Sequence, residues 1–396
     1  MAAVASVFGS DDLLREILHR LNSPTCLVRS AAVSKRWLRH ASDRAFLHRF
    51  RARHPPSPLG FYLVESGRPS VLFEPTRRPP ALAPSVRGGG GGLGLGHRLL
   101  IDVSDCRNGR LLATVSHPCT YAVGHPLNPA RGITAFPKPR IREVPMPEDG
   151  GDAMSLHNPS FFHSRQLLLL GDGTSCIAVT LMRDRNHRRV WVHLQTLQLE
   201  TGFWGETTTS DPIELPQPLL GNVQFLRRKF GALNDGKLYM HCTSRYILGL
   251  DLAPTSLFYV KLPEGLMFEY VANTALSNAE GGGFCLVHVK RLQISVWRYS
   301  MDSSNTGSWN LVHTMCMRQK FGHISGSIWH SFDDVIYVAA VGDNAEFVYL
   351  LVRDEIFYMY IGSRTVEKVY KLLQQHGIMF ALYPLMAVWP PTPSQC

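Results

Sequence analysis

The sequence predicts an α+β multidomain protein, in which a small N-terminal helical module precedes a mainly-β body that folds as a β-propeller of about six blades. Apolar residues recur at helical spacing near the N-terminal end. After residue 99, short apolar strands alternate with turns rich in Gly and Asp, and turn anchors recur at positions 109, 173, 236, 282 and 334. A Pro- and Gly-rich stretch, in which one short strand is expected at Phe61 to Val64, separates the two patterns. We therefore expect a helical module over residues 1–54, a linker over 55–98 and a propeller-like domain over 99–389.

The composition is that of a folded protein, because 45% of the 396 residues are hydrophobic and 18% are charged. The formal net charge is +10, and residues 11–54 carry ten Lys and Arg against four Asp and Glu. More than half of the excess positive charge therefore lies on the helical module. A basic module of this kind suits an acidic protein partner as well as phosphate. We interpret it as a protein-binding module and do not expect nucleic acid as its partner.

The sequence of the helical module predicts four short helices separated by capping residues. The expected N-caps of the four helices are, in chain order, Ser10, Ser23, Ser34 and either Ser42 or Asp43. Asp11 and Asp12 follow the first cap, where the helix dipole favours negative charge, and Pro24 opens the second helix. A unit of about 45 residues is near the lower limit for a self-sufficient core. We therefore expect its apolar side chains to need a partner surface.

Four sequence segments of this module carry a resemblance to a known family: DDLLREIL, the following Ser-Pro, VSKRW and DRAFLHRF. In this order they resemble an F-box, the helical module by which substrate receptors dock onto the Skp-type adaptor of cullin-based (SCF) ubiquitin ligases. Most family members have Leu-Pro before the acidic pair, whereas this chain has Gly9-Ser10. The resemblance implies that the residues facing the adaptor are Leu13, Leu14, Ile17, Leu18, Leu21, Leu27, Val33 and Trp37. The competing interpretation is that these helices only cap the C-terminal body.

The β body is predicted from its turns. Asn108-Gly109 favours a tight hairpin between strands near 99–104 and 111–116, and similar turns occur near 171–173, 234–236, 281–283 and 333–334. A small sheet built from a few such hairpins cannot bury both of its faces alone. We therefore expect several of these sheets to stack around a common axis. The segments DCRNGRLL and HPLNPAR make the body similar to the divergent propeller-like domains that follow the F-box in plant F-box proteins. A β-sandwich or two smaller β domains remain open as alternatives.

We find no motif that predicts catalysis, a cofactor or a metal centre. H-E-x-x-H and G-x-S-x-G are absent, and the glycine run at 88–92 lacks the Lys-Ser/Thr of a phosphate-binding loop. The eight scattered cysteines indicate reduced thiols, and we predict neither a signal peptide nor a membrane span. Two basic runs, at 183–189 and 227–229, are either solvated loops or a cationic rim that holds an acidic substrate segment.

These observations predict a non-catalytic protein of the cytoplasm, the nucleus or both. The expected function is that of a substrate-recognition subunit of an SCF ubiquitin ligase, which docks on the Skp-type adaptor, and through it on cullin, and binds an unidentified target protein with the β domain. The alternative function is that of a propeller enzyme or carbohydrate-binding protein in which the helical N-terminus is purely structural.

Overall fold

A computed structural model of the chain describes residues 10–22, 24–54, 58–65, 70–76, 100–115, 120–139, 162–171, 174–184, 188–216, 230–241, 245–266, 273–301, 307–317, 336–372 and 380–386. The chain divides into two compact units. The helical unit comprises residues 1–59 and 385–396, and the propeller unit comprises residues 60–384. Each unit is described separately below.

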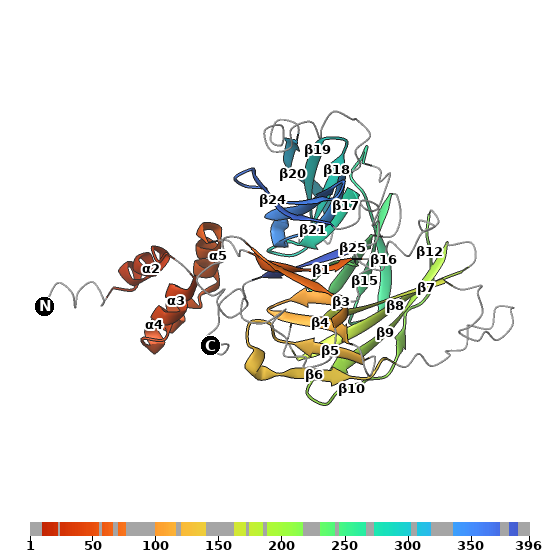
Figure 1. Ribbon diagram of the computed structural model, residues 1–396, viewed down its shortest axis with the longest axis horizontal. Coiled ribbons are helices and arrows are strands. Elements are labelled where there is room, and N and C mark those ends of the chain that lie inside the picture. Colours follow the sequence, from red (N-terminus) through yellow and green to blue (C-terminus); the bar gives the residue numbers. More distant parts are fainter. Residues whose placement is uncertain are drawn as a thin grey trace, which may run out of the picture. The chain divides into compact units, whose positions relative to one another are not determined.

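The helical unit contains short helices (Figure 1). Side-chain caps are found at the starts of three of them. Ser10 Oγ accepts a hydrogen bond from the backbone N–H of Leu13, and Asp43 Oδ1 accepts one from Phe46 at 2.9 Å. Ser34 caps its helix in the same way, while the predicted cap Ser23 lies outside the described residues. The helices are α2 (Asp11–His19), α3 (Pro24–Ala31), α4 (Lys35–Ala41) and α5 (Arg44–Arg53).

The helical unit has its own small hydrophobic core. Phe46 and Phe50 of α5 stack with ring centroids 5.8 Å apart, and both are completely buried. The core residues are Leu14, Leu18, Leu27, Ala31, Ala41, Phe46 and Phe50, with Leu21, Trp37 and Leu47 packed against them. The buried leucines of the first helix, Leu14 and Leu18, therefore help to hold the four helices together. This is the ordinary role of the apolar face of an amphipathic helix.

The propeller unit is built from six antiparallel sheets, or blades, which confirms the predicted architecture (Figure 1). Blade 1 contains β3 (Leu100–Arg107), β4 (Arg110–Val115), β5 (Thr120–Gly124) and β6 (Ile133–Phe136). Blade 2 contains β7 (Phe162–Leu169), β8 (Ser175–Arg183), β9 (Arg189–Gln198), β10 (Phe203–Trp204), β11 (Thr208–Thr209) and β12 (Ile213–Glu214). Blade 3 contains β13 (Phe230–Asn234), β14 (Lys237–His241), β15 (Tyr246–Asp251) and β16 (Ser256–Lys261).

Blades 4 and 5 also join consecutive strands, whereas blade 6 does not. Blade 4 contains β17 (Thr274–Asn278), β18 (Phe284–Lys290), β19 (Gln293–Met301) and β20 (Gly307–Cys316). Blade 5 contains β21 (Ile336–Val341), β22 (Phe347–Val352), β23 (Glu355–Tyr360) and β24 (Thr365–Lys371). Blade 6 is composite, because it joins β1 (Pro58–Glu65) and β2 (Leu72–Pro75) to the late strand β25 (Phe380–Met386) in the order β2-β1-β25.

Part of the predicted linker over residues 55–98 belongs to the composite blade, and the short strand expected at 61–64 lies within β1. Every residue of β1 is buried, and β1 pairs with β2 in antiparallel register from Gly60 with Pro75 to Leu63 with Leu72. The Pro/Gly content of this stretch indicated a linker, but its apolar run PLGFYLVE completes a sheet that otherwise holds one late strand. Pairing an early strand with a late one closes a propeller ring and removes two exposed edges. The glycine run at 88–92 lies outside the described residues.

Two of the predicted hairpin turns are confirmed by their backbone geometry. Asn108 and Gly109 have φ values of 53° and 69°, and Asp235 and Gly236 have values of 49° and 71°. Two consecutive residues in the left-handed region form the turn whose twist matches that of the flanking strands, which explains the Asn-Gly and Asp-Gly pairs. The turns that contain Gly173 and residues 333–334 lie outside the described residues.

Neighbouring blades are joined at the turns between their first and second strands. The first strands of successive blades contact each other, as β3 does with β7, β13 with β17, and β17 with β21. At this end of the sheets, side chains accept hydrogen bonds from the backbone of a neighbouring blade. Asp105 Oδ2 accepts from Leu169 N at 2.8 Å, Asn278 Oδ1 accepts from Leu233 N at 2.8 Å, and Asn344 Oδ1 accepts from Glu280 N at 2.6 Å. We call this end of the propeller unit the stapled end.

Candidate functional site

The helical unit exposes large apolar side chains in three successive elements. Leu13 of α2 is 46% exposed, Val33 in the turn after α3 is 67% exposed, and Leu38 of α4 is 37% exposed. Exposed apolar side chains that occur singly are normal on protein surfaces. Here they occur on a unit whose own core is small, and they leave apolar area that an additional protein could cover.

The structure divides the eight predicted adaptor-facing residues into two groups. Leu14, Leu18 and Leu27 have exposed fractions of 0%, 0% and 2%, because they fill the core of the helical unit. In this packing the three side chains serve the core of the helical unit, and their contact with the adaptor stays a prediction. The accessible or half-buried members of the set are Leu13, Ile17, Leu21, Val33 and Trp37, and for these residues the adaptor contact stays a prediction.

A polar cluster fixes α2 against α4. Arg36 Nε donates to Asp11 Oδ1 at 2.8 Å, and His40 Nε2 lies 3.1 Å from the same oxygen. Arg15 Nε donates to His40 Nδ1 at 3.2 Å. The hydrogen bonds from Arg36 and then His40 hold the pKa of Asp11 below its usual value. The cluster, which we call the Asp11 clamp, therefore sets the orientation of the two helices that carry Leu13 and Leu38.

Sequence reasoning missed two features of this unit. Leu38 was not among the predicted contact residues, although it directly follows the tryptophan of the VSKRW segment. The pairing of Asp11 with Arg36 could not be found from local spacing, because the two residues are 25 positions apart and lie on different helices. The acidic residue at the start of α2 had been explained by the helix dipole alone.

No group of three or more His, Cys, Asp and Glu side chains within the described ranges is placed to hold a metal ion. Burial raises the pKa of the Cys285 thiol to about 11 and that of Cys176 to about 12. Both thiols are therefore protonated at neutral pH and are poor nucleophiles. No helix in the described ranges has the length and apolar character needed to cross a membrane.

Four aromatic residues of the sequence, Phe203, Trp204, Tyr246 and Trp329, are candidates for anchoring a partner. Phe203 is 77% exposed at the start of β10. Its neighbour Trp204 is half-buried, packs against Phe136 and donates its indole N–H to the carbonyl oxygen of Pro137 at 2.9 Å, so it serves packing between blades 1 and 2. Tyr246 is half-buried, and Trp329 lies outside the described residues. Phe203 is therefore the aromatic residue of this set that is best placed to contact a partner.

Of the two predicted basic runs, the first is partly described and the second lies outside the described residues. Arg183, at the end of β8, is 3% exposed, and burial lowers the pKa of its guanidinium. Arg188 and Arg189, across the same turn, are exposed. Asp184 Oδ1 accepts hydrogen bonds from the backbone N–H groups of Arg188 and Arg189 at 3.0 and 3.2 Å, which shapes the turn.

Together these features define a β-propeller protein with a separate N-terminal helical unit. The family model described as "F-box protein AT5G49610-like, beta-propeller" matches residues 102–392, and the chain belongs to this family. The match begins inside β3, so it covers blades 1 to 5 and the late strand β25 and leaves the four helices, β1 and β2 outside. A comparison with curated proteins found no match.

Solved structures with low sequence identity also align with the chain. A structural genomics protein of unknown function from Bacteroides thetaiotaomicron has a TM-score of 0.34 and 9% identity, with 67% of this chain and 56% of that chain covered. Dihydro-heme d1 dehydrogenase NirN has a TM-score of 0.34 and 13% identity, with 83% of this chain and 76% of that chain covered. The GH93 α-L-arabinofuranosidase of Fusarium graminearum has a TM-score of 0.33 and 11% identity, with 69% of this chain and 80% of that chain covered. The chain spans 56%, 29% and 28% of the length of the first three structures matched.

Proposed function

We propose that this protein is the substrate-recognition subunit of an SCF-type ubiquitin ligase. In this proposal the helical unit is an F-box that docks on a Skp-type adaptor, and through it on cullin, while the propeller unit binds a target protein. The chain supplies proximity rather than chemistry: holding the target near the conjugating enzyme raises the effective concentration of its lysines. The membership of the propeller in an F-box family is the observation that carries the proposal.

The helical unit supports the adaptor half of the proposal. Its exposed Leu13, Val33 and Leu38 leave apolar surface on helices that the Asp11 clamp holds in place. Burial of a few apolar anchors at the centre of an interface supplies most of the binding energy in protein complexes. The order of the segments DDLLREIL, VSKRW and DRAFLHRF supports an F-box on the same helices.

The experiment is co-purification of the full-length chain with a Skp-type adaptor. We expect the wild-type chain to bind, and the double variant Leu13→Ser with Val33→Ser to lose about tenfold or more in affinity. The matched control is Leu311→Ser with Val312→Ser in β20, because these side chains are 52% and 47% exposed on the propeller unit. The control should bind the adaptor like wild type. Equal binding by wild type and by the Leu13/Val33 variant would show that this surface is not the docking site.

The proposed binding of a target protein by the propeller unit is tested with the same wild-type and variant chains. Affinity purification from cells should recover at least one further protein with the wild-type chain and with the Leu13/Val33 variant, because the propeller unit is unchanged in both. Recovery of the adaptor alone, with no protein held by the propeller unit, would contradict a receptor role.

A further inference from the structure

The turns between the second and third strands of the blades lie at the end of the propeller unit opposite the stapled end. In each four-stranded antiparallel sheet, the turn from the second to the third strand lies at the other end from the turn between the first and second strands. The hydrogen bonds from Asp105, Asn278 and Asn344 show that the first-to-second turns of neighbouring blades lie together. The second-to-third turns of the blades must therefore also share one end. We call it the open-turn end.

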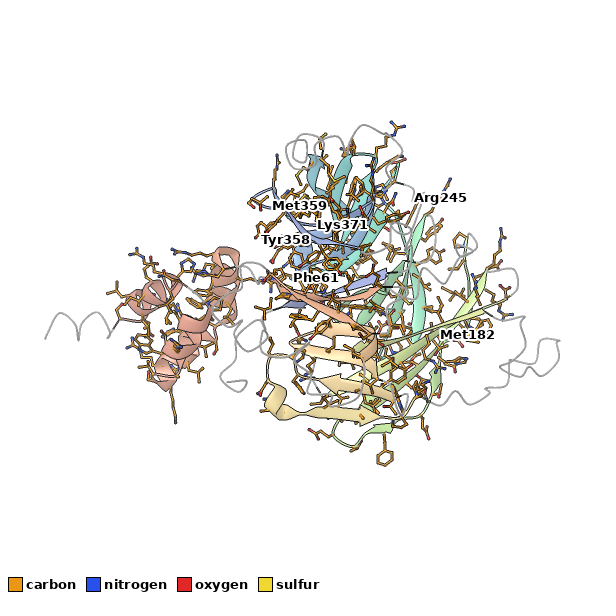
Figure 2. The ribbon with its side chains drawn as sticks, in the orientation of Figure 1. Phe61, Met182, Arg245, Tyr358, Met359 and Lys371 are labelled. Atoms are coloured by element: carbon orange, nitrogen blue, oxygen red, sulfur yellow. The ribbon has the colours of Figure 1, made fainter. Side chains whose placement is uncertain are left out.

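Each described second-to-third turn carries exposed positive charge. Blade 2 contributes the turn between β8 and β9, blade 3 that before β15, blade 4 that between β18 and β19, and blade 5 that between β22 and β23. The exposed basic residues of these turns are Arg188, Arg189, Arg245, Lys290, Arg291 and Arg353. Lys261, the last residue of β16, is exposed at the same end, and so is Lys371, the last residue of β24, although its charge is paired with Asp354. Figure 2 shows Arg245 and Met182 of β8 toward the same side of the propeller unit.

Several carboxylates at the open-turn end already have partners. Asp184 accepts two backbone N–H groups, and Asp354 lies 3.3 Å from Lys371 Nζ. Glu355 is paired with Lys368. Among the described residues near this end, the exposed carboxylates are Asp211, Glu214 and Glu264. Positive charge therefore exceeds negative charge on the exposed surface of this end.

The stapled end has the opposite balance. The exposed acidic residues in its described turns are Glu200, Asp235, Glu280 and Asp343, against the exposed arginines Arg131 and Arg364. A sequence total of +10 would not by itself separate the charges in this way. The two ends of one rigid β scaffold therefore differ in sign, and an incoming charged ligand is steered to one of them.

We propose that the open-turn end is the substrate-binding surface and that it holds an acidic segment of the target protein. The proposal deepens the proposed function, since it assumes that the propeller unit binds the target. Arginine guanidinium groups bind carboxylates in a bidentate geometry, and four of the blades present such groups. A ligand that meets several of them must extend across neighbouring blades, which suits an extended peptide that carries several Asp or Glu side chains.

The test is fluorescence anisotropy with the full-length protein and three labelled probes of equal net charge: a Glu-rich peptide, a phosphoserine peptide and a single-stranded RNA. Arg291→Asn with Arg353→Asn is the test variant, because both residues have φ near +55°, which Asn tolerates. Arg131→Gln with Arg364→Asn at the stapled end is the control, since it removes the same charge from exposed positions and Arg364 has φ 56°. Circular dichroism and thermal unfolding verify that both variants are folded.

We expect the Glu-rich peptide to bind the wild-type protein, with affinity falling as salt rises. The test variant should lose about tenfold in affinity, because it removes two guanidinium groups that contact the peptide, and the control less than about twofold, because it removes charge at the other end of the propeller unit. Tighter binding of the phosphoserine peptide with the same loss in the test variant would also support the surface and would identify phosphate as the preferred acidic group. Equal losses in both variants, no peptide binding, or tighter binding of RNA than of both peptides would each overturn the proposal. None of these outcomes depends on the adaptor, so the docking proposal is tested separately.

Discussion

The ring of Phe61, in the early strand β1, packs against the ring of Tyr349, in β22 of blade 5, with centroids 5.4 Å apart. Phe61 also meets Tyr370 of β24 edge to face at 6.3 Å. The early strand is thus held by hydrogen bonding within its own sheet and by aromatic packing against the preceding blade. Blade 6 closes the ring through contacts between residues that are far apart in the sequence. Figure 2 labels Phe61 together with Tyr358, which packs against Tyr349 at 5.3 Å.

Replacing Phe61 by Ala should strongly destabilise the propeller unit. Phe61 is 1% exposed, and removing a buried Phe side chain costs about 3–5 kcal/mol because a cavity remains. Urea or thermal unfolding measures the effect. Phe203→Ala, at a position that is 77% exposed, is the matched control and should change the free energy of unfolding by no more than about 0.5 kcal/mol. Similar small effects for both variants would show that β1 does not hold the ring closed.

Replacing Tyr349 by Phe should stabilise the protein. The Tyr349 hydroxyl is buried and has no hydrogen-bond partner in the described part of the chain, and burial raises the pKa of this phenol well above its usual value. Removing an unpaired buried hydroxyl while keeping the ring should add about 1 kcal/mol to the free energy of unfolding. A decrease measured by denaturant unfolding would mean that this hydroxyl makes a bond that the described residues do not show.

Leu13 and Leu14 should respond in opposite ways in two assays. Leu14→Ala removes a completely buried side chain and should cost the helical unit about 2–5 kcal/mol, measured by amide hydrogen exchange of α2. Leu13→Ala changes a side chain that is 46% exposed, so exchange should stay near wild type while adaptor binding weakens. If Leu14→Ala lowered adaptor binding without faster exchange, Leu14 would contact the adaptor directly and its assignment to the core would be wrong.

The Asp11 clamp should weaken at low pH. Because Arg36 and His40 hold the pKa of Asp11 below its usual value of 3.8, the charged carboxylate stabilises the folded helices. This contribution is fully present above about pH 4 and is lost as the pH falls through the lowered pKa. Amide hydrogen exchange of α2 should therefore accelerate on acidification more in the wild type than in Asp11→Asn, which has no titrating group at position 11. Parallel acid responses of the two proteins would exclude Asp11 as the cause.

Much of the fold could be predicted from local sequence signals. Asn108-Gly109 and Asp235-Gly236 require left-handed backbone, so these dipeptides identified their hairpins and, with the recurring turns, indicated about six blades. The caps Ser10 and Ser34 were predicted correctly because an N-cap depends only on residues three positions away. At the fourth helix the structure decided between Ser42 and Asp43 in favour of Asp43.

The closing blade and the two charged ends could not be predicted in this way. The segment before residue 76 looked like a linker because its partner strand, Phe380–Met386, occurs about three hundred residues later. No local sequence pattern connects the single arginines Arg245, Arg291 and Arg353. They share one end of the propeller unit because each lies at the second-to-third turn of a different blade.

The sequence by itself determined where turns and helix caps occur, which segments alternate as strands, and that a helical module precedes a repeated β body, because these features depend on interactions within a few residues. Only the tertiary structure decided which leucines of the first helix are buried, which strand completes the sixth blade, and which charges share an end. Those outcomes depend on contacts between distant segments, where packing and hydrogen bonding assign each side chain to the interior or the surface.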